Sequence, residues 1–217
     1  MYPKTGKKVF KESVDGSENA IISFSLFASK SFEYENAYLN AADILVEGFI
    51  CQKGDFNSNL IYPIVFLYRQ YLELFMKDIL KNYNKVIFLD KLDDKESQLK
   101  KILGQHNLEL IWEKIEELAI SIGSEFPTKI EDMEMSEILN NTKKYIEEIE
   151  NMDRKSFAFR YPSDKEDELY HKQIDTKISI CNLKECVHEI KNVLLEIQGT
   201  LCYVREMNEL IYHNMYL

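Results

Sequence analysis

The sequence predicts an all-α protein, built as an up-and-down bundle of four to five long helices. The chain of 217 residues contains only 7 glycines and 4 prolines, whereas turn-dense β architectures use both residues heavily. Apolar residues also recur at steps of three and four along several segments, which is the period of a helix with one buried face. A chain of this length can bury one substantial core. We therefore expect one bundle domain over residues 33–217, preceded by an irregular N-terminal arm over residues 1–32.

Residues 62–83 form the predicted central helix. Pro63 suits its first turn, because the missing N–H costs nothing there and the backbone angle is already helical. The following apolar side chains share one wide face: Ile64, Leu67, Tyr68, Tyr71, Leu72, Phe75, Ile79 and Leu80. Arg69, Glu73 and Lys77 form a polar line on the same helix, at i, i+4 and i+8.

Two interpretations of this polar line remain open. It could be a solvated face whose ion pairs each contribute about 0.2–0.5 kcal/mol, and exposed pairs of this kind are common. Bulky apolar neighbours instead favour burial, in which case each charge needs a partner and the group becomes a candidate site. On the second interpretation we expect Glu73 to pair with Arg69 or Arg160.

Four further segments have the helical period. Residues 31–51 place a stripe of aromatic and small residues on one face: Tyr34, Ala37, Tyr38, Ala41, Leu45 and Phe49. The short break at 54–59 predicts that this helix is the antiparallel neighbour of the central helix. A helix over 108–123, N-capped by Asn107, has an apolar face: Leu108, Ile111, Trp112, Ile115, Leu118 and Ile122. The remaining helices are expected over 132–152 and over 183–212, the latter capped by Asn182 and packed against the central helix.

Residues 153–163 lack the helical pattern and predict a short extended loop. Aromatic residues alternate here with other residues, as in an extended segment: Phe157, Ala158, Phe159, Arg160 and Tyr161. Pro162 also favours extended backbone at the residue before it. Arg160 is a candidate binding residue, because an arginine among aromatic rings can stack on them, bind a phosphate or anchor the loop.

Charge and cysteine usage exclude several classes of protein. The chain has 27 Lys and Arg against 37 Asp and Glu, a net charge of −10, so bulk DNA binding is not expected. The four cysteines lack any Cys-x-x-Cys pair and are interpreted as reduced, buried thiols. We expect neither a metal nor a cofactor. Since no targeting segment and no bilayer-length apolar run is evident, the predicted location is cytoplasmic, without membrane association.

Histidine and arginine supply the remaining candidates for chemistry. His106 stands just before a predicted helix, where it could cap backbone groups or act as an acid or base. Arg205 and His213 lie on one side of the last helix, two turns apart, and could meet across a dimer. The candidate catalytic pair is Arg205 and His213. The candidate binding residues are Arg69, Glu73, Lys77, His106, Arg160 and Tyr161.

Three motifs, FLYRQYLELFMKDIL, HNLELIW and FAFRYP, together resemble the HEPN superfamily (higher eukaryotes and prokaryotes nucleotide-binding) over roughly residues 61–162. The resemblance implies a helical bundle that is often dimeric. In many members it also implies metal-independent RNase activity within toxin–antitoxin, CRISPR or phage-defence systems. The catalytic signature of the family is an arginine followed by a polar residue, with a histidine about a turn and a half later. Here Arg205-Glu206 and His213 have a longer spacing.

The first expected function is therefore a HEPN-like helical module in a bacterial defence or mobile-element context. It would act by homodimerisation and by binding a protein partner, a nucleotide or RNA. The alternative is a metal-independent endoribonuclease, in which His213 or His106 moves protons. An arginine would then stabilise the phosphorane charge: Arg205, Arg160 or Arg69. A third hypothesis is a small-molecule pocket between the central helix and the FRYP loop.

Overall fold

The computed structural model describes residues 30–51, 59–87, 99–122, 129–130, 133–153, 158–161, 163, 166 and 177–215. Within these ranges, side chains are described except at 30–33, 83–87, 129–130, 133 and 211–215. Residues Ser31–Leu217 form one compact unit. The predicted N-terminal arm, apart from its last residues, lies outside the described part of the chain.

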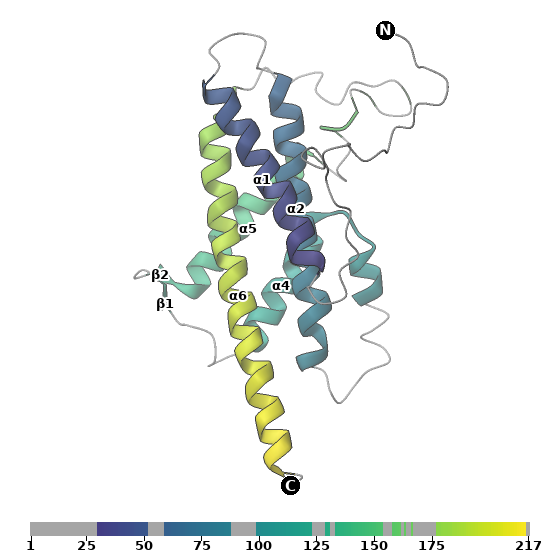
Figure 1. Ribbon diagram of the computed structural model, residues 1–217, viewed down its shortest axis with the longest axis vertical. Helices are drawn as coiled ribbons and strands as arrows, with labels where there is room; N and C mark the ends of the chain where they lie inside the picture. Colours follow the sequence, from purple (N-terminus) through teal and green to yellow (C-terminus); the bar gives the residue numbers. More distant parts are fainter. Residues whose placement is uncertain are drawn as a thin grey trace, which may run out of the picture. The chain divides into compact units, whose positions relative to one another are not determined.

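The prediction of an all-α fold is confirmed (Figure 1). The long helices are α1 (Lys30–Cys51), α2 (Ile61–Ile87), α4 (Leu108–Ser121), α5 (Met135–Met152) and α6 (Ile180–Met215); residues 99–103 are also helical. Sequence analysis did not predict the antiparallel pair formed by β1 (Lys129–Ile130) and β2 (Met133–Glu134). Among the described residues, no helix combines the length and apolar character that a bilayer crossing requires.

Four helices close into a ring around one core. α2 packs against both α4 and α6, and α5 packs against the same two helices. The prediction that the last helix packs against the central helix is therefore confirmed. All eight predicted apolar residues of α2 are buried except Leu67, which is half-buried, and the six predicted for 108–122 are all buried.

Helix α1 lies antiparallel beside α2 (Figure 1), and the stripe predicted on it is buried only in part. Its buried residues are Glu35, Leu39, Ala42 and Val46, whereas Tyr34 and Ala37 are exposed. Tyr38, Leu45 and Phe49 of the predicted stripe are half-buried against the core, so the helical period is confirmed and the most buried face is rotated from the predicted one. Polar contacts contribute to the observed phase, because Asp43 accepts a hydrogen bond from the Tyr68 hydroxyl (2.7 Å) and lies 3.0 Å from His188 Nε2.

The FRYP segment is not extended in its described part. Residues 158–160 form a turn in which both Ala158 and Phe159 are buried, while Arg160 and Tyr161 are exposed. The Asp153 carboxylate accepts a hydrogen bond from the Ala158 N–H (2.7 Å). This bond draws the chain back toward the end of α5, so the alternation of side chains expected for a strand is lost.

Two smaller predictions are also wrong. Ser179, rather than Asn182, caps α6, since its hydroxyl accepts a hydrogen bond from the Asn182 N–H (3.3 Å). All four cysteines are free, as expected. Cys51 and Cys181 are exposed, however, whereas Cys186 and Cys202 are half-buried.

Glu35 is an acidic residue inside the α1–α2 interface. Its side chain is 1 % exposed, and its Oε2 atom has no hydrogen-bond partner among the described residues. Burial, together with the nearby charge of Asp78, raises the pKa of Glu35 to about 8 from its ordinary value of 4.5. Between these two pH values the folded chain holds a proton that the unfolded chain has lost.

We therefore expect the free energy of unfolding to fall as pH rises from 4.5 through 8. One such proton contributes a slope of roughly one kcal/mol per pH unit. Glu35→Gln should flatten this part of the profile, measured by urea denaturation at several pH values. Glu47→Gln, which changes an exposed carboxylate on the same helix, is the matched control. Equal slopes for Glu35→Gln and the unsubstituted chain would contradict the assignment.

Candidate functional site

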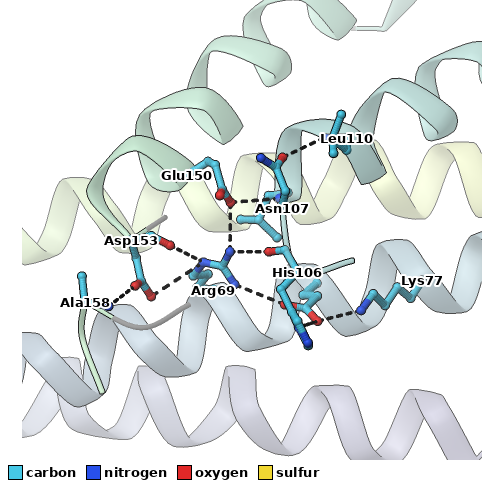
Figure 2. A network of polar contacts seen from close by, with 10 residues as sticks. Arg69, Lys77, His106, Asn107, Leu110, Glu150, Asp153 and Ala158 are labelled. Atoms are coloured by element: carbon cyan, nitrogen blue, oxygen red, sulfur yellow. Dashed lines mark hydrogen bonds and ion pairs between the residues drawn. The ribbon is translucent and has the colours of Figure 1, made fainter. Parts of the chain in front are cut away.

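A fully buried arginine on α2 holds three separate segments together. Arg69 is 0 % exposed. Its Nε donates to the backbone carbonyl of Asp153 (3.1 Å), and its Nη2 donates to the carbonyl of His106. Figure 2 shows the guanidinium between the loop that precedes α4 and the end of α5. Arg69 thus joins α2 to residues 37 and 84 positions further along the chain.

Three carboxylates surround this guanidinium. Arg69 Nη1 lies 3.2 Å from Glu73 Oε2 and Nη2 lies 2.9 Å from Glu150 Oε2, while Nε is 3.7 Å from Asp153 Oδ2. A charge without water must be paired and hydrogen-bonded, and the planar fork of arginine suits several acceptors at once. Arg69 therefore pairs with groups inside the protein rather than with a ligand.

Glu150 accepts hydrogen bonds from two helices at once. The same Oε2 atom that accepts from Arg69 also accepts from the backbone N–H of Leu108 (2.9 Å). This places a negative charge at the start of α4, where the helix dipole favours it. Asn107 Oδ1 accepts from the Leu110 N–H (2.9 Å), so the predicted N-cap is confirmed.

Glu73 links the buried arginine to an exposed histidine. Its Oε1 atom accepts from Lys77 Nζ (2.8 Å) and lies 2.8 Å from His106 Nδ1. Glu73 is 3 % exposed, whereas the His106 side chain is 63 % exposed. Burial alone would raise the pKa of Glu73, but the hydrogen bonds and charges of Lys77 and His106 outweigh it and lower that pKa. Glu73 is therefore an ionised carboxylate behind the imidazole.

Asp153 marks the other end of the group. Its Oδ1 accepts from the Ala158 N–H, whereas its Oδ2 is buried and has no hydrogen bond to a described residue. Burial raises the pKa of Asp153, and Arg69 and the turn at 158–159 offset only part of this rise. Asp153 therefore holds the turn in place, and its pKa lies above its ordinary value.

The structure brings four of the candidate binding residues together. Arg69, Glu73 and Lys77 are buried and paired, so the interpretation as a solvated face is wrong and the expected Arg69–Glu73 pair is confirmed. The ring of His106 does not cap α4, because it lies against Glu73.

Of the other candidates, Arg160 and Tyr161 belong to the 158–161 segment that Asp153 holds, whereas Arg205 and His213 lie on α6. Arg160 stacks on aromatic rings, with its guanidinium carbon 5.7 Å from the Phe66 ring centre and 5.8 Å from that of Tyr161. Arg205 is on α6, 3.8 Å from Glu209. His213 is on the same helix, and its side chain lies outside the described residues.

Sequence reasoning missed Glu150 and Asp153. A signal was present, because an acidic residue in the last turn of a helix is opposed by the helix dipole and needs a compensating cation. Both residues stand at the end of α5. What the sequence could not supply was the partner, since Arg69 is 81 residues away from Glu150.

No group of three or more metal-ligating side chains could hold a metal ion in the part of the chain that the structure describes. Comparison of the sequence and fold with protein-family models, curated proteins and solved structures gave no significant match. The chemistry of the site must therefore be judged from its own geometry.

Replacing Arg69 with methionine should destabilise the protein by about 3–5 kcal/mol, because Glu150 and Asp153 would lose the guanidinium that pairs with them and Glu73 would keep only Lys77. Denaturant unfolding measures this change. Arg205→Met is the matched control, since Arg205 pairs with Glu209 at a partly exposed position, where such a pair contributes about 0–1 kcal/mol. Similar losses for the two variants would contradict the structural role of Arg69.

Proposed function

We propose that the chain is a HEPN-like helical module that binds RNA or another nucleotide-containing ligand at the His106 surface. One observation carries this proposal. The exposed imidazole of His106 is held by a buried carboxylate, with His106 Nδ1 and Glu73 Oε1 2.8 Å apart. A carboxylate that accepts from Nδ1 sets the tautomer and leaves Nε2 to face a ligand. In Figure 2 the imidazole lies at the edge of the polar group, beside Lys77.

The charge balance of the group limits the way it can bind. Arg69 and Lys77 carry two positive charges, and Glu73, Glu150 and Asp153 are three acids. If His106 is protonated, the formal charges of Arg69, Lys77 and His106 balance those of the three acids. The surface is therefore suited to hydrogen bonding with a ligand, for example with a ribose 2′-hydroxyl or a single phosphate oxygen. It is not suited to non-specific capture of a polyanion.

A second candidate, metal-independent RNA cleavage, is favoured by the same pairing of imidazole and carboxylate. Neutral His106 would take the proton of a 2′-hydroxyl through Nε2, and that oxygen would attack the adjacent phosphorus. The bond from phosphorus to the 5′-oxygen breaks, and the leaving oxygen takes up a proton from water, while the imidazolium returns its own proton to the solvent. The products are a 2′,3′-cyclic phosphate and a 5′-hydroxyl. Arg69 cannot reach such a phosphate, because it is fully buried.

The test of both functions uses a short single-stranded RNA in the presence of EDTA. We expect His106→Gln to weaken RNA binding about tenfold, which corresponds to one charge-assisted hydrogen bond. Fluorescence anisotropy measures binding, and gel electrophoresis measures cleavage. His188→Gln is the matched control, because His188 also contacts a carboxylate, that of Asp43, at a separate place.

The outcomes separate the candidates. Binding that depends on His106 without cleavage supports the module, and cleavage that His106→Gln abolishes supports the ribonuclease. Cleavage abolished by Arg205→Ala and His213→Ala, with His106→Gln unaffected, would place the chemistry on α6 instead. Absence of both binding and cleavage at high protein concentration would contradict the proposed function.

The proposal includes self-association through the end of α6. Tyr203, Met207 and Leu210 are exposed and lie at i, i+4 and i+7, which places them on one face. Arg205 and Glu209 stand at equal distances on either side of Met207. At about 100° per residue, however, both lie on the side of α6 away from Met207, so antiparallel pairing of two copies about Met207 would rest on Tyr203, Met207 and Leu210.

We expect the unsubstituted chain to form a dimer and Met207→Glu to weaken its association at least about tenfold. Light scattering after size-exclusion chromatography, over a range of protein concentrations, measures the change. Ile120→Glu alters an exposed isoleucine on α4 and serves as the control. A monomeric unsubstituted chain at every concentration would refute the α6 interface and leave the proposal for His106 untouched.

A further inference from the structure

A cavity of about 330 Å³ lies where α2, α5, the 158–161 turn and the start of α6 meet. Val65, which lines the cavity, precedes Arg69 by one turn of α2, whereas Lys77 follows Arg69 by two turns. The cavity and Lys77 therefore lie on opposite sides of Arg69 along this helix. The lining residues are Val65, Tyr145, Glu148, Ile149, Met152, Phe159, Lys177, Ile178, Ser179, Asn182, Leu183 and Cys186. This matches the position of the third sequence-based hypothesis, a pocket between the central helix and the FRYP loop.

The walls of this cavity are mostly apolar. Ile149, Met152, Phe159 and Leu183 supply aliphatic, thioether and aromatic surface. Pockets for small molecules typically have volumes upward of about 300 Å³, with apolar walls and a few polar groups. The cavity is therefore large enough to hold a ligand with one fused ring system.

Its polar groups are concentrated on the side formed by α5 and α6. Tyr145, Glu148 and Cys186 line the cavity there. The charge of Glu189 is the largest of the effects that raise the pKa of Tyr145. Burial, followed by the charges of Glu189 and Glu148, raises the pKa of the Cys186 thiol. The charge of Glu148 contributes to both shifts, and its carboxylate lines the cavity, where it can pair with a positively charged group.

We propose that this cavity binds a small organic cation, with a planar apolar body between Met152 and Phe159 and a protonated amine facing Glu148. The proposal goes beyond the function at His106 and does not depend on it. Lys177, the cation among the lining residues, disfavours a second positive charge on the ligand, so a monoamine is the expected class.

Tryptamine is a suitable probe, because it joins an indole ring to one amine. Tryptophol has the same ring with a neutral hydroxyl, and indole-3-acetate carries a negative charge instead. We expect calorimetry to give the order tryptamine, tryptophol, indole-3-acetate, with about a threefold preference for the amine over the alcohol. Such a preference is typical of an ion pair at a partly exposed carboxylate.

The alkylation rate of Cys186 measures occupancy of this cavity specifically. Alkylation by iodoacetamide, followed by peptide mass spectrometry, should slow at Cys186 when tryptamine is bound. Cys202 is also half-buried but does not line the cavity, so its rate should stay constant. Equal protection of the two cysteines would show general stabilisation and overturn the assigned site.

Two variants complete the test. Ile149→Trp should fill the cavity and abolish binding of all three probes, while thermal unfolding confirms that the variant is folded. Glu148→Gln should remove the preference for the amine but retain tryptophol binding, and Glu147→Gln, outside the lining, should change neither. Tryptamine binding that survives Ile149→Trp, or a preference unaltered by Glu148→Gln, would overturn the proposal, as would absence of binding to the unsubstituted chain.

Discussion

The burial of one guanidinium determines how several segments of this molecule are positioned. Arg69 has no access to water, so its hydrogen bonds must come from the protein, and the cost of leaving them unmade is high. The carbonyl of His106, in the loop before α4, and the carboxylate of Glu150, on α5, meet this demand. The start of α4 and the end of α5 are thereby held against the same turn of α2. The His106 side chain, in contrast, is exposed.

The helices could be predicted because each depends on local periodicity. The α2 face and the α4 face follow the three- and four-residue steps of apolar residues, and their burial agrees with the prediction. On α1 the apolar pattern is ambiguous, because Leu39, Ala42 and Val46 form an alternative stripe to the one led by Tyr34. Contacts of Asp43 with Tyr68 and His188 help to decide between them, and such contacts depend on tertiary structure.

The candidate site was predicted in its α2 residues and in His106, but the contacts between helices that complete it were not predicted. Arg69, Glu73 and Lys77 follow from their spacing, whereas burial of the line depended on α4 and α5 covering it. The prediction of an extended FRYP segment was wrong for a related reason. Its alternation of aromatic residues is a local signal, but the hydrogen bond from Ala158 to Asp153 imposes a turn. Where a polar contact joins distant segments, the local pattern alone is insufficient.

The spacing of the Arg69 contacts along the chain has a consequence for how the molecule assembles. Contacts that span 37, 81 and 84 residues require closure of long loops, which slows their formation relative to single helices. During synthesis, α2 emerges well before Glu150 and Asp153 are made. Its guanidinium must remain hydrated until then. Among these contacts of Arg69, the one with His106 can therefore form first, and those with Glu150 and Asp153 complete the network last.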